Sequence, residues 1–292
     1  MLGEVITAMV TPFDAAGAVN VDKFRELAQF LVDHGSDGLV VTGTTGESPT
    51  LSDDEKLELY AAAKDAVGER ATIIAGTGTY DTHHSARLTR RAHDLGVDAF
   101  LVVTPYYSKP PQRAIVRHFE EIAAETDKPI VAYNIPARVV INIEPKTMAQ
   151  LAEIDNVTAV KQAHDDLEEA RFIAQETRLD LYSGDDNITF DFLELGGVGV
   201  VSVIAHVWGE QMKRMIRRHA EGDVEGARAL NRELRPAYDL LKVTTNPIGV
   251  KTALNLLGHD LGGFRLPMVE ATREEAEQIR GCLERGGVLA TA

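Results

Sequence analysis

The sequence predicts an α/β fold of the TIM type, a (β/α)8 barrel with a small helical appendage at its C-terminal end. Two observations carry this prediction. Short runs rich in β-branched residues alternate with helical patterns eight times, and eight is the number of parallel strands that closes such a barrel. The chain has 292 residues, which suits one barrel of about 250 residues with a short extension.

The predicted strands are short apolar runs bounded by turn-forming residues, a pattern typical of buried parallel strands. They cover residues 5–11, 38–44, 71–77, 99–105, 129–136, 157–163, 179–186 and 198–205. A doubly wound open sheet would produce the same alternation and is the competing architecture.

Between the strands the apolar period becomes that of a helix, most clearly over residues 21–34 and 52–67. Ser52 and Glu55 open the second of these helices with the pattern of a capping box. After residue 205 the strand signal ends, and helical patterns cover residues 224–244, 248–257 and 270–285. We therefore expect a barrel that carries the active site over residues 1–223 and a helical region over residues 224–292.

The composition excludes several classes of partner. A net charge of -15 argues against binding to nucleic acid or to an anionic membrane. Cys282 is the only cysteine, so the chain has neither an internal disulfide nor a cysteine-based metal site. No run approaches the roughly 20 apolar residues of a membrane span, and residues 1–13 lack the pattern of a signal peptide. These features predict a soluble, cytoplasmic protein.

Lys161 follows the apolar run Val157-Thr158-Ala159-Val160, at the end of a predicted buried strand. Burial of an ammonium group favours its neutral form, and a neutral amine is a nucleophile toward carbonyl carbon. The alternative is a lysine whose head reaches water from the strand end. Since the active site of a (β/α)8 barrel lies at the carboxyl ends of its strands, Lys161 is the first candidate for catalysis.

A glycine-rich turn, Gly43-Thr44-Thr45-Gly46-Glu47-Ser48, follows the second predicted strand. Its exposed backbone N–H groups and paired hydroxyls could cradle a carboxylate or a phosphate, although a plain βα turn would look similar. A Lys-Ser/Thr pair of the Walker type does not follow the glycines, which argues against a nucleotide loop.

Tyrosines and an arginine lie at two further strand ends. Tyr106 and Tyr107 follow the fourth strand, and Tyr133 lies on the fifth, where a hydroxyl could relay protons around an amine. Arg138 comes soon after and offers a guanidinium fork for a substrate carboxylate, or for a surface ion pair.

Asp185 and Asp186 follow the seventh strand, but neighbours on an extended segment point apart. Without a third ligand at a matching spacing, we expect a structural or water-ordering role and no metal site. His83, His84 and His206 also lack ligand partners in the pattern.

Taken together, these motifs resemble the dihydrodipicolinate synthase/N-acetylneuraminate lyase family of Schiff-base-forming class I aldolases. The resemblance covers nearly the whole chain and includes the 43–47 turn, the segment Tyr133-Asn134-Ile135-Pro136, Lys161, Asn246-Pro247-Ile248 and Arg265-Leu266-Pro267. It implies a TIM barrel with a short helical C-terminal region, and no metal or organic cofactor.

The resemblance also implies a role for each candidate residue. Lys161 would form an imine with pyruvate, and the derived enamine would attack an aldehyde acceptor. Thr45 would hold the pyruvate carboxylate, while the backbone of Gly184 and Val201 would shape the pocket. Thr44, Tyr133 and Tyr107 would form a proton relay. In this family the tyrosine at position 107 comes from the neighbouring subunit of a tight dimer, which implies a homotetramer built from two such dimers.

Arg138 distinguishes members of the family. Synthases place an arginine at this position, where it receives the carboxylate of L-aspartate-4-semialdehyde on the route to lysine and diaminopimelate. Val139 departs from the threonine that is usual in synthases. A synthase is therefore the expected activity, and two alternatives stay open. One is an aldolase or lyase acting on N-acetylneuraminate, keto-deoxy sugar acids or 4-hydroxy-2-oxoglutarate, and the other is a non-catalytic binding barrel.

Some synthases of this family are inhibited by lysine bound in a cleft at the dimer interface. They carry a histidine, an asparagine and a glutamate where this chain has Lys56, Tyr80 and His84, whereas Ser48 and Tyr106 are retained. Without that glutamate, and with the positive charge of Lys56, we expect no inhibition by L-lysine.

Overall fold

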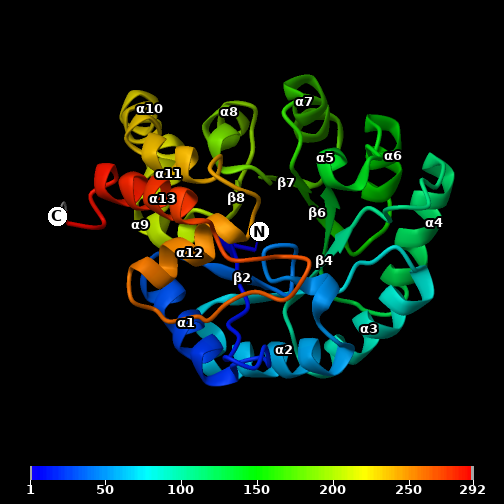
Figure 1. Ribbon diagram of the computed structural model, residues 1–292. Coiled ribbons are helices and arrows are strands. Elements are labelled where there is room, and N and C mark those ends of the chain that lie inside the picture. Colours follow the sequence, from blue (N-terminus) through cyan, green and yellow to red (C-terminus); the bar gives the residue numbers. More distant parts are fainter. Residues whose placement is uncertain (1, 291–292) are drawn as a thin grey trace.

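The computed structural model describes residues 2–290 and contains a closed barrel of eight parallel strands (Figure 1). Each strand pairs with the next one in the chain, and β8 pairs with β1. The prediction of a (β/α)8 barrel is confirmed, and the open doubly wound sheet is excluded. The strands are β1 (Val5–Ala8), β2 (Gly38–Val41), β3 (Thr72–Gly76), β4 (Ala99–Val103), β5 (Ile130–Asn134), β6 (Val157–Gln162), β7 (Asp180–Ser183) and β8 (Gly199–Ser202).

All eight strands lie within their predicted ranges, but they end one to three residues earlier than the apolar runs do. Strand β2 shows why. Thr42 has a φ of 55°, a left-handed conformation that no strand residue adopts, and this turns the chain out of the sheet. The polar residues that follow therefore lie in loops above the barrel instead of in the hydrogen-bonded ladder.

Helices surround the strands, as the ring in Figure 1 shows. The first nine are α1 (Val21–Asp33), α2 (Asp53–Val67), α3 (Thr82–Asp94), α4 (Gln112–Ala123), α5 (Pro136–Val139), α6 (Pro145–Ala152), α7 (Leu167–Glu176), α8 (Thr189–Glu194) and α9 (Ala205–Ala220). Short 3-10 turns occur at Ser48–Thr50, Gly68–Arg70 and Asp186–Ile188. The capping box predicted at the start of α2 is present, with Ser52 and Glu55 each bonded to the backbone of the other.

The C-terminal region is helical, with one correction to the predicted boundaries. Its helices are α10 (Val224–Glu233), α11 (Arg235–Leu240), α12 (Ile248–Leu256) and α13 (Arg273–Arg285). The single helix expected over residues 224–244 is wrong, because the chain forms two helices with a break at Leu234. Pro236 explains the break, since proline has no N–H to donate to the preceding turn and its ring clashes with that turn.

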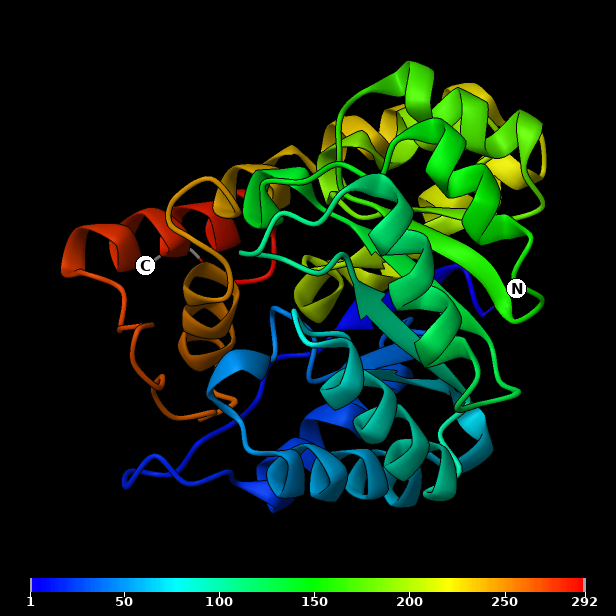
Figure 2. The ribbon, with the colours of Figure 1, turned by 90° about the vertical axis from the view of Figure 1, so that its right-hand side faces the viewer.

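The buried residues form three clusters, and two of them matter for the site. One fills the inside of the barrel and includes Val40, Leu101, Tyr133 and Val201. Another joins β8 and α9 to the C-terminal helices, which lie together on one side of the barrel in Figure 2. The C-terminal helices therefore share a core with the barrel. Among residues 2–290, no helix is long and apolar enough to cross a membrane.

Candidate active site

A cavity of about 420 Å³ opens at the carboxyl ends of strands β2 to β5. Barrel residues form its floor, and the loops after β2, β3, β4 and β5 form its walls. Thr44, Tyr133, Arg138 and Val139 are among the lining residues, so three of the predicted site residues lie around one space. A cavity of this size holds a small organic substrate.

Lys161 lies on β6 directly beside Tyr133 of β5, since the two residues are partners in the strand register. Its side chain is buried, with 5% exposure, and its Nζ lies 4.3 Å from the centre of the Tyr133 ring. Within residues 2–290 this Nζ makes no hydrogen bond or ion pair within 4 Å, so no protein group occupies it.

Lys251 is a second deeply buried lysine, and its surroundings are different. Its Nζ donates to the carbonyl of Thr11 at 2.8 Å and to that of Gly263, and it pairs with Glu47 at 3.3 Å. Desolvation lowers its pKa to about 8, but all three donor positions are occupied and the side chain has no exposed surface. Lys251 is therefore held in a structural arrangement, whereas Lys161 is available to a substrate.

The turn formed by residues 43–47 carries two of the predicted hydroxyls. Glu47 adopts a left-handed conformation with φ of 56°, and the N–H groups of Gly46 and Glu47 bond back to Gly43 and Thr44. Glycine relieves crowding at position 46, because a Cβ there would lie 3.0 Å from the carbonyl oxygen of Met9. The Thr44 side chain is half-buried and faces the cavity.

Thr45 is buried next to the cavity-lining residue Thr44 and contacts the C-terminal region. Its Oγ1 accepts a hydrogen bond of 2.9 Å from Nδ2 of Asn246. Because the oxygen accepts here, the hydroxyl proton of Thr45 is left to donate to another group. Oδ1 of Asn246 is buried and has no hydrogen-bond partner among the described residues.

Arg138 lies in the short helix α5, which follows β5 and begins at Pro136. Its guanidinium is exposed, lines the cavity, and donates a 3.3 Å hydrogen bond to the backbone carbonyl of Asn246. Asn246 thus contacts both residues that we expect to receive substrate carboxylates, Thr45 through its side chain and Arg138 through its backbone.

Gly184 directly follows β7, which pairs with β6, and Val201 lies on β8. The N–H of Gly184 bonds to the carbonyl of Gln162 at 2.8 Å, and a Cβ on Gly184 would lie 2.7 Å from the Cβ of Ala163. Glycine is therefore required there by close packing. Val201 is buried inside the barrel, in the same cluster as Tyr133.

Tyr107 is the one predicted site residue that the chain does not bring to the others. Its side chain is 91% exposed, and its backbone has a left-handed φ of 70°, which is uncommon for an aromatic residue. Tyr106 instead lines the cavity and packs edge-on against Tyr80, with 5.4 Å between the ring centres. Within one chain, Tyr107 is not among the residues that line the cavity.

Of the two aspartates that follow β7, Asp186 binds the backbone at the end of β8. Asp186 is buried and accepts hydrogen bonds from Ser202 Oγ at 2.5 Å and from the N–H of Val203 at 2.9 Å, which fixes the chain that leaves β8. Burial raises the pKa of Asp186 to about 6. In the described part of the chain, no three His, Cys, Asp or Glu side chains are grouped as metal ligands.

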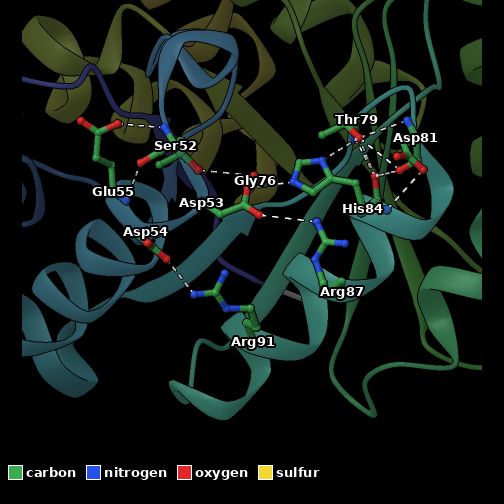
Figure 3. A network of polar contacts seen from close by, with 12 residues as sticks. Ser52, Asp53, Asp54, Glu55, Gly76, Thr79, Asp81, His84, Arg87 and Arg91 are labelled. Atoms are coloured by element: carbon green, nitrogen blue, oxygen red, sulfur yellow. Dashed lines mark hydrogen bonds and ion pairs between the residues drawn. The ribbon is translucent and has the colours of Figure 1, made fainter.

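The outer wall of the cavity carries a network of charges at the start of α2 and α3 (Figure 3). Asp53 bonds to Nε2 of His84 at 2.8 Å and lies 3.9 Å from a guanidinium nitrogen of Arg87. Lys56 is 4% exposed and lines the same wall, but it makes no hydrogen bond or ion pair within 4 Å among residues 2–290. Burial lowers its pKa, against an opposing attraction from Asp53.

Sequence patterns did not identify Asn246, Lys251 or Glu47 as functional residues. Asn246 appeared only within a motif shared with a family, and Glu47 only as part of a turn. Their contacts join residues about 200 positions apart, which no local period reveals. One sequence feature could have identified Asn246 and Lys251 as candidates: they are polar residues on either side of the apolar start of a helix.

The fold and the cavity define an enzyme of the (β/α)8 barrel class, with a buried amine beside a small-substrate site at the carboxyl ends of the strands. The sequence profile of the Dihydrodipicolinate synthetase family matches residues 1–285. The chain belongs to this family.

Individual relatives agree over the full length. A 4-hydroxy-tetrahydrodipicolinate synthase of Moorella thermoacetica is 51% identical over 98% of this chain and 99% of its own. A dihydrodipicolinate synthase of Cyanidioschyzon merolae, solved with lysine bound, is 41% identical, with a TM-score of 0.97 and 99% of each chain covered. The chloride-inhibited enzyme of Acinetobacter baumannii, solved with pyruvate, is 33% identical, with a TM-score of 0.96 over 99% of this chain and 100% of that one.

Proposed function

We propose that this chain is an aldolase-type lyase that condenses pyruvate with L-aspartate-4-semialdehyde to form 4-hydroxy-tetrahydrodipicolinate, a step in lysine and diaminopimelate biosynthesis. Family membership over residues 1–285 and the Moorella relative support this activity. The observation that carries it is Lys161, a buried amine without hydrogen bonds that lies over the Tyr133 ring beside the cavity.

Lys161 acts as the nucleophile. Its neutral amine attacks the keto carbon of pyruvate, and loss of water leaves an imine. Removal of a methyl proton gives the enamine, whose carbon attacks the aldehyde carbon while the aldehyde oxygen takes up a proton. The amino group of the acceptor then attacks the imine carbon and expels Lys161, which closes the ring. Thr44, Tyr133 and a Tyr107 from a second subunit carry the protons.

The carboxylates of the two substrates bind at separate places. The Thr45 hydroxyl and the backbone of the 43–47 turn hold pyruvate, because the Thr45 oxygen already accepts from Asn246 and its proton is free. Arg138 holds the carboxylate of the acceptor at the mouth of the cavity. Gly184 and Val201 border the imine, where their small or apolar surface leaves room for it.

The proposed assembly is a homotetramer made of two tight dimers. The exposed Tyr107 supports this assembly, because a large aromatic side chain with 91% exposure fits a position that a second subunit covers. We also propose that residues 1–223 form the catalytic barrel and residues 224–292 a helical region that packs on it, as their shared core suggests.

Borohydride trapping tests the mechanism. Incubation with pyruvate and sodium borohydride should add one reduced pyruvyl group to Lys161, as peptide mapping would show. The Lys161→Arg variant should take up no label and lose most activity, since a permanently charged guanidinium forms no imine. Lys109→Arg, a change at an exposed lysine, is the control that should label normally. Absence of label in the wild-type chain would point to a binding barrel.

An acceptor panel tests the substrate. Aspartate-4-semialdehyde should be turned over with pyruvate far faster than N-acetylneuraminate, keto-deoxy sugar acids or 4-hydroxy-2-oxoglutarate are cleaved. Faster cleavage of one of those keto acids would assign the chain to a different activity of the family.

A further inference from the structure

The 43–47 turn is held from outside the barrel by the segment of residues 246–265. This segment is the orange part of the ribbon in Figure 1, which runs from α12 back toward the blue start of the chain. Its three contacts with the turn region are Asn246 on Thr45, Lys251 on Glu47, and the N–H of Arg265 on Glu47 at 3.1 Å. The loop that is proposed to bind pyruvate thus depends on residues about 200 positions further along the chain.

Glu47 is the centre of these contacts. Its side chain has 1% exposure, and its two carboxylate oxygens accept from Lys251 and from the Arg265 backbone. Its own backbone is left-handed, which costs a non-glycine residue free energy and persists only where the surroundings fix it. The Glu47 side chain therefore fixes the backbone conformation of the turn.

Lys251 makes more contacts here than its ion pair with Glu47 alone. Besides Glu47, its Nζ contacts the carbonyl groups of Thr11 and Gly263, and it lies 4.4 Å from the centre of the Phe13 ring. Thr11 links Lys251 to the turn a second time, because its hydroxyl donates a 2.7 Å hydrogen bond to the carbonyl of Gly46 inside the turn. Lys251 thus reaches the turn from two sides, through Glu47 and through Thr11.

We propose that Lys251 is a positioning residue for the reaction: by holding Glu47 and Thr11, it keeps the 43–47 turn in the conformation that receives the carboxylate of pyruvate. This inference rests on the proposed function. It assigns Lys251 no contact with substrate and no proton transfer. Loss of Lys251 should therefore weaken pyruvate binding more than it slows the chemistry at Lys161.

The test is the pyruvate dependence of borohydride trapping in Lys251→Met. We expect the pyruvate concentration for half-maximal labelling of Lys161 to rise at least tenfold, while the labelling rate at saturating pyruvate changes less. Because a lone buried carboxylate could unfold this variant, Glu47→Gln with Lys251→Met provides a neutral pair of similar shape. It should show the same rise with a recovered melting temperature.

Lys213→Met is the matched control. Lys213 forms a partly buried 2.5 Å ion pair with Asp37, which also accepts from the N–H of Val5 at the start of β1, and neither residue lines the cavity. This variant should lose stability and keep the wild-type pyruvate dependence. Half-saturation that is unchanged in the folded Lys251 variants would overturn the positioning role. Failure of the wild-type chain to label at all would instead overturn the proposed function.

Discussion

At the scale of single residues, Arg138 is the residue that we propose to select the acceptor. It lines the cavity, and the only hydrogen bond of its side chain among the described residues is a long one to the Asn246 carbonyl, so most of its guanidinium donors are free. A charge-assisted bidentate contact contributes roughly 1.5–3 kcal/mol, which corresponds to a ten- to hundredfold effect.

Arg138→Ala should therefore lower kcat/KM for aspartate-4-semialdehyde at least about tenfold. Imine formation with pyruvate should be nearly unchanged, because Lys161 and the 43–47 turn are untouched. Steady-state kinetics and borohydride trapping measure the two effects separately. Arg138→Lys is the comparison that keeps the charge and removes the fork. Equal kinetics in the wild type and the alanine variant would show that Arg138 is an ordinary surface residue.

The charges on the outer wall of the cavity lead to a prediction about regulation. Asp53 is already engaged by His84 and Arg87, whereas buried Lys56 has no hydrogen bond or ion pair within 4 Å in the part of the chain that the structure describes. We therefore expect this wall to repel an ammonium group more than it attracts one. L-Lysine at about 1 mM should leave the rate unchanged. The Cyanidioschyzon merolae enzyme, solved with lysine bound, is the positive control for a calorimetric binding titration. Half-inhibition at or below that concentration would contradict the prediction.

How far sequence predicts the site also depends on single residues. Lys161, Tyr133 and Thr44 could be predicted because each stands at the end of a local apolar run, where barrel topology gathers such residues. Asn246 and Lys251 could not, because their partners come from loops that only the folded chain brings near. The exposure of Tyr107 likewise depends on the loop conformation, which apolar periodicity does not encode.

At the scale of elements, the strands were predictable and their ends were not. Strand β2 was expected to continue through Thr44, but the left-handed Thr42 ends it at Val41. The helix expected over residues 224–244 is broken at Leu234, two residues before Pro236, whose missing N–H gives a physical reason visible in the sequence. In both cases the predicted range extended past the point where the backbone changes direction.

Helix α2 gives a prediction about pH, because Arg265 clamps its first turn. Both carboxylate oxygens of Glu55 accept from this guanidinium, at 2.6 and 3.0 Å, and the Arg265 hydrogen bonds lower the pKa of Glu55 from 4.5 to about 2. A lowered pKa means that the contact stabilises the fold above about pH 4.5 and that this stabilisation disappears as the pH falls toward 2.

Arg265→Met should accordingly reduce the free energy of unfolding by about 1–2 kcal/mol at pH 7, a value that allows for partial exposure of the pair. The difference from wild type should shrink at pH 3, where Glu55 is more often protonated in the unfolded chain. Urea unfolding at both pH values measures this. Arg273→Met removes an exposed ion pair with Glu277 on α13 and should change little. A deficit that is equally large at pH 3 would assign the effect to the other contacts of Arg265.

At the scale of the whole molecule, the proposed role of Tyr107 predicts that one chain alone does not form a complete site. Variants Tyr107→Phe and Lys161→Ala should each have little activity alone. A hybrid dimer of the two contains one site with both native residues and should regain part of the activity. Purified hybrids carrying two different affinity tags, assayed beside each parent homodimer, measure the recovery. Hybrids as inactive as the parents would indicate that each subunit works by itself.

The contacts of residues 246–265 also bear on how the enzyme is made. Every proposed catalytic and substrate-binding residue lies before position 202 and is synthesised while the C-terminal helices are still absent. A nascent or prematurely terminated chain that ends after residue 223 would carry Lys161, Tyr133 and Thr44, but none of the contacts that Asn246, Lys251 and Arg265 make with the 43–47 turn. Competence to bind pyruvate therefore arrives with the last part of the chain to leave the ribosome, so incomplete products would carry the reactive lysine without a formed substrate site.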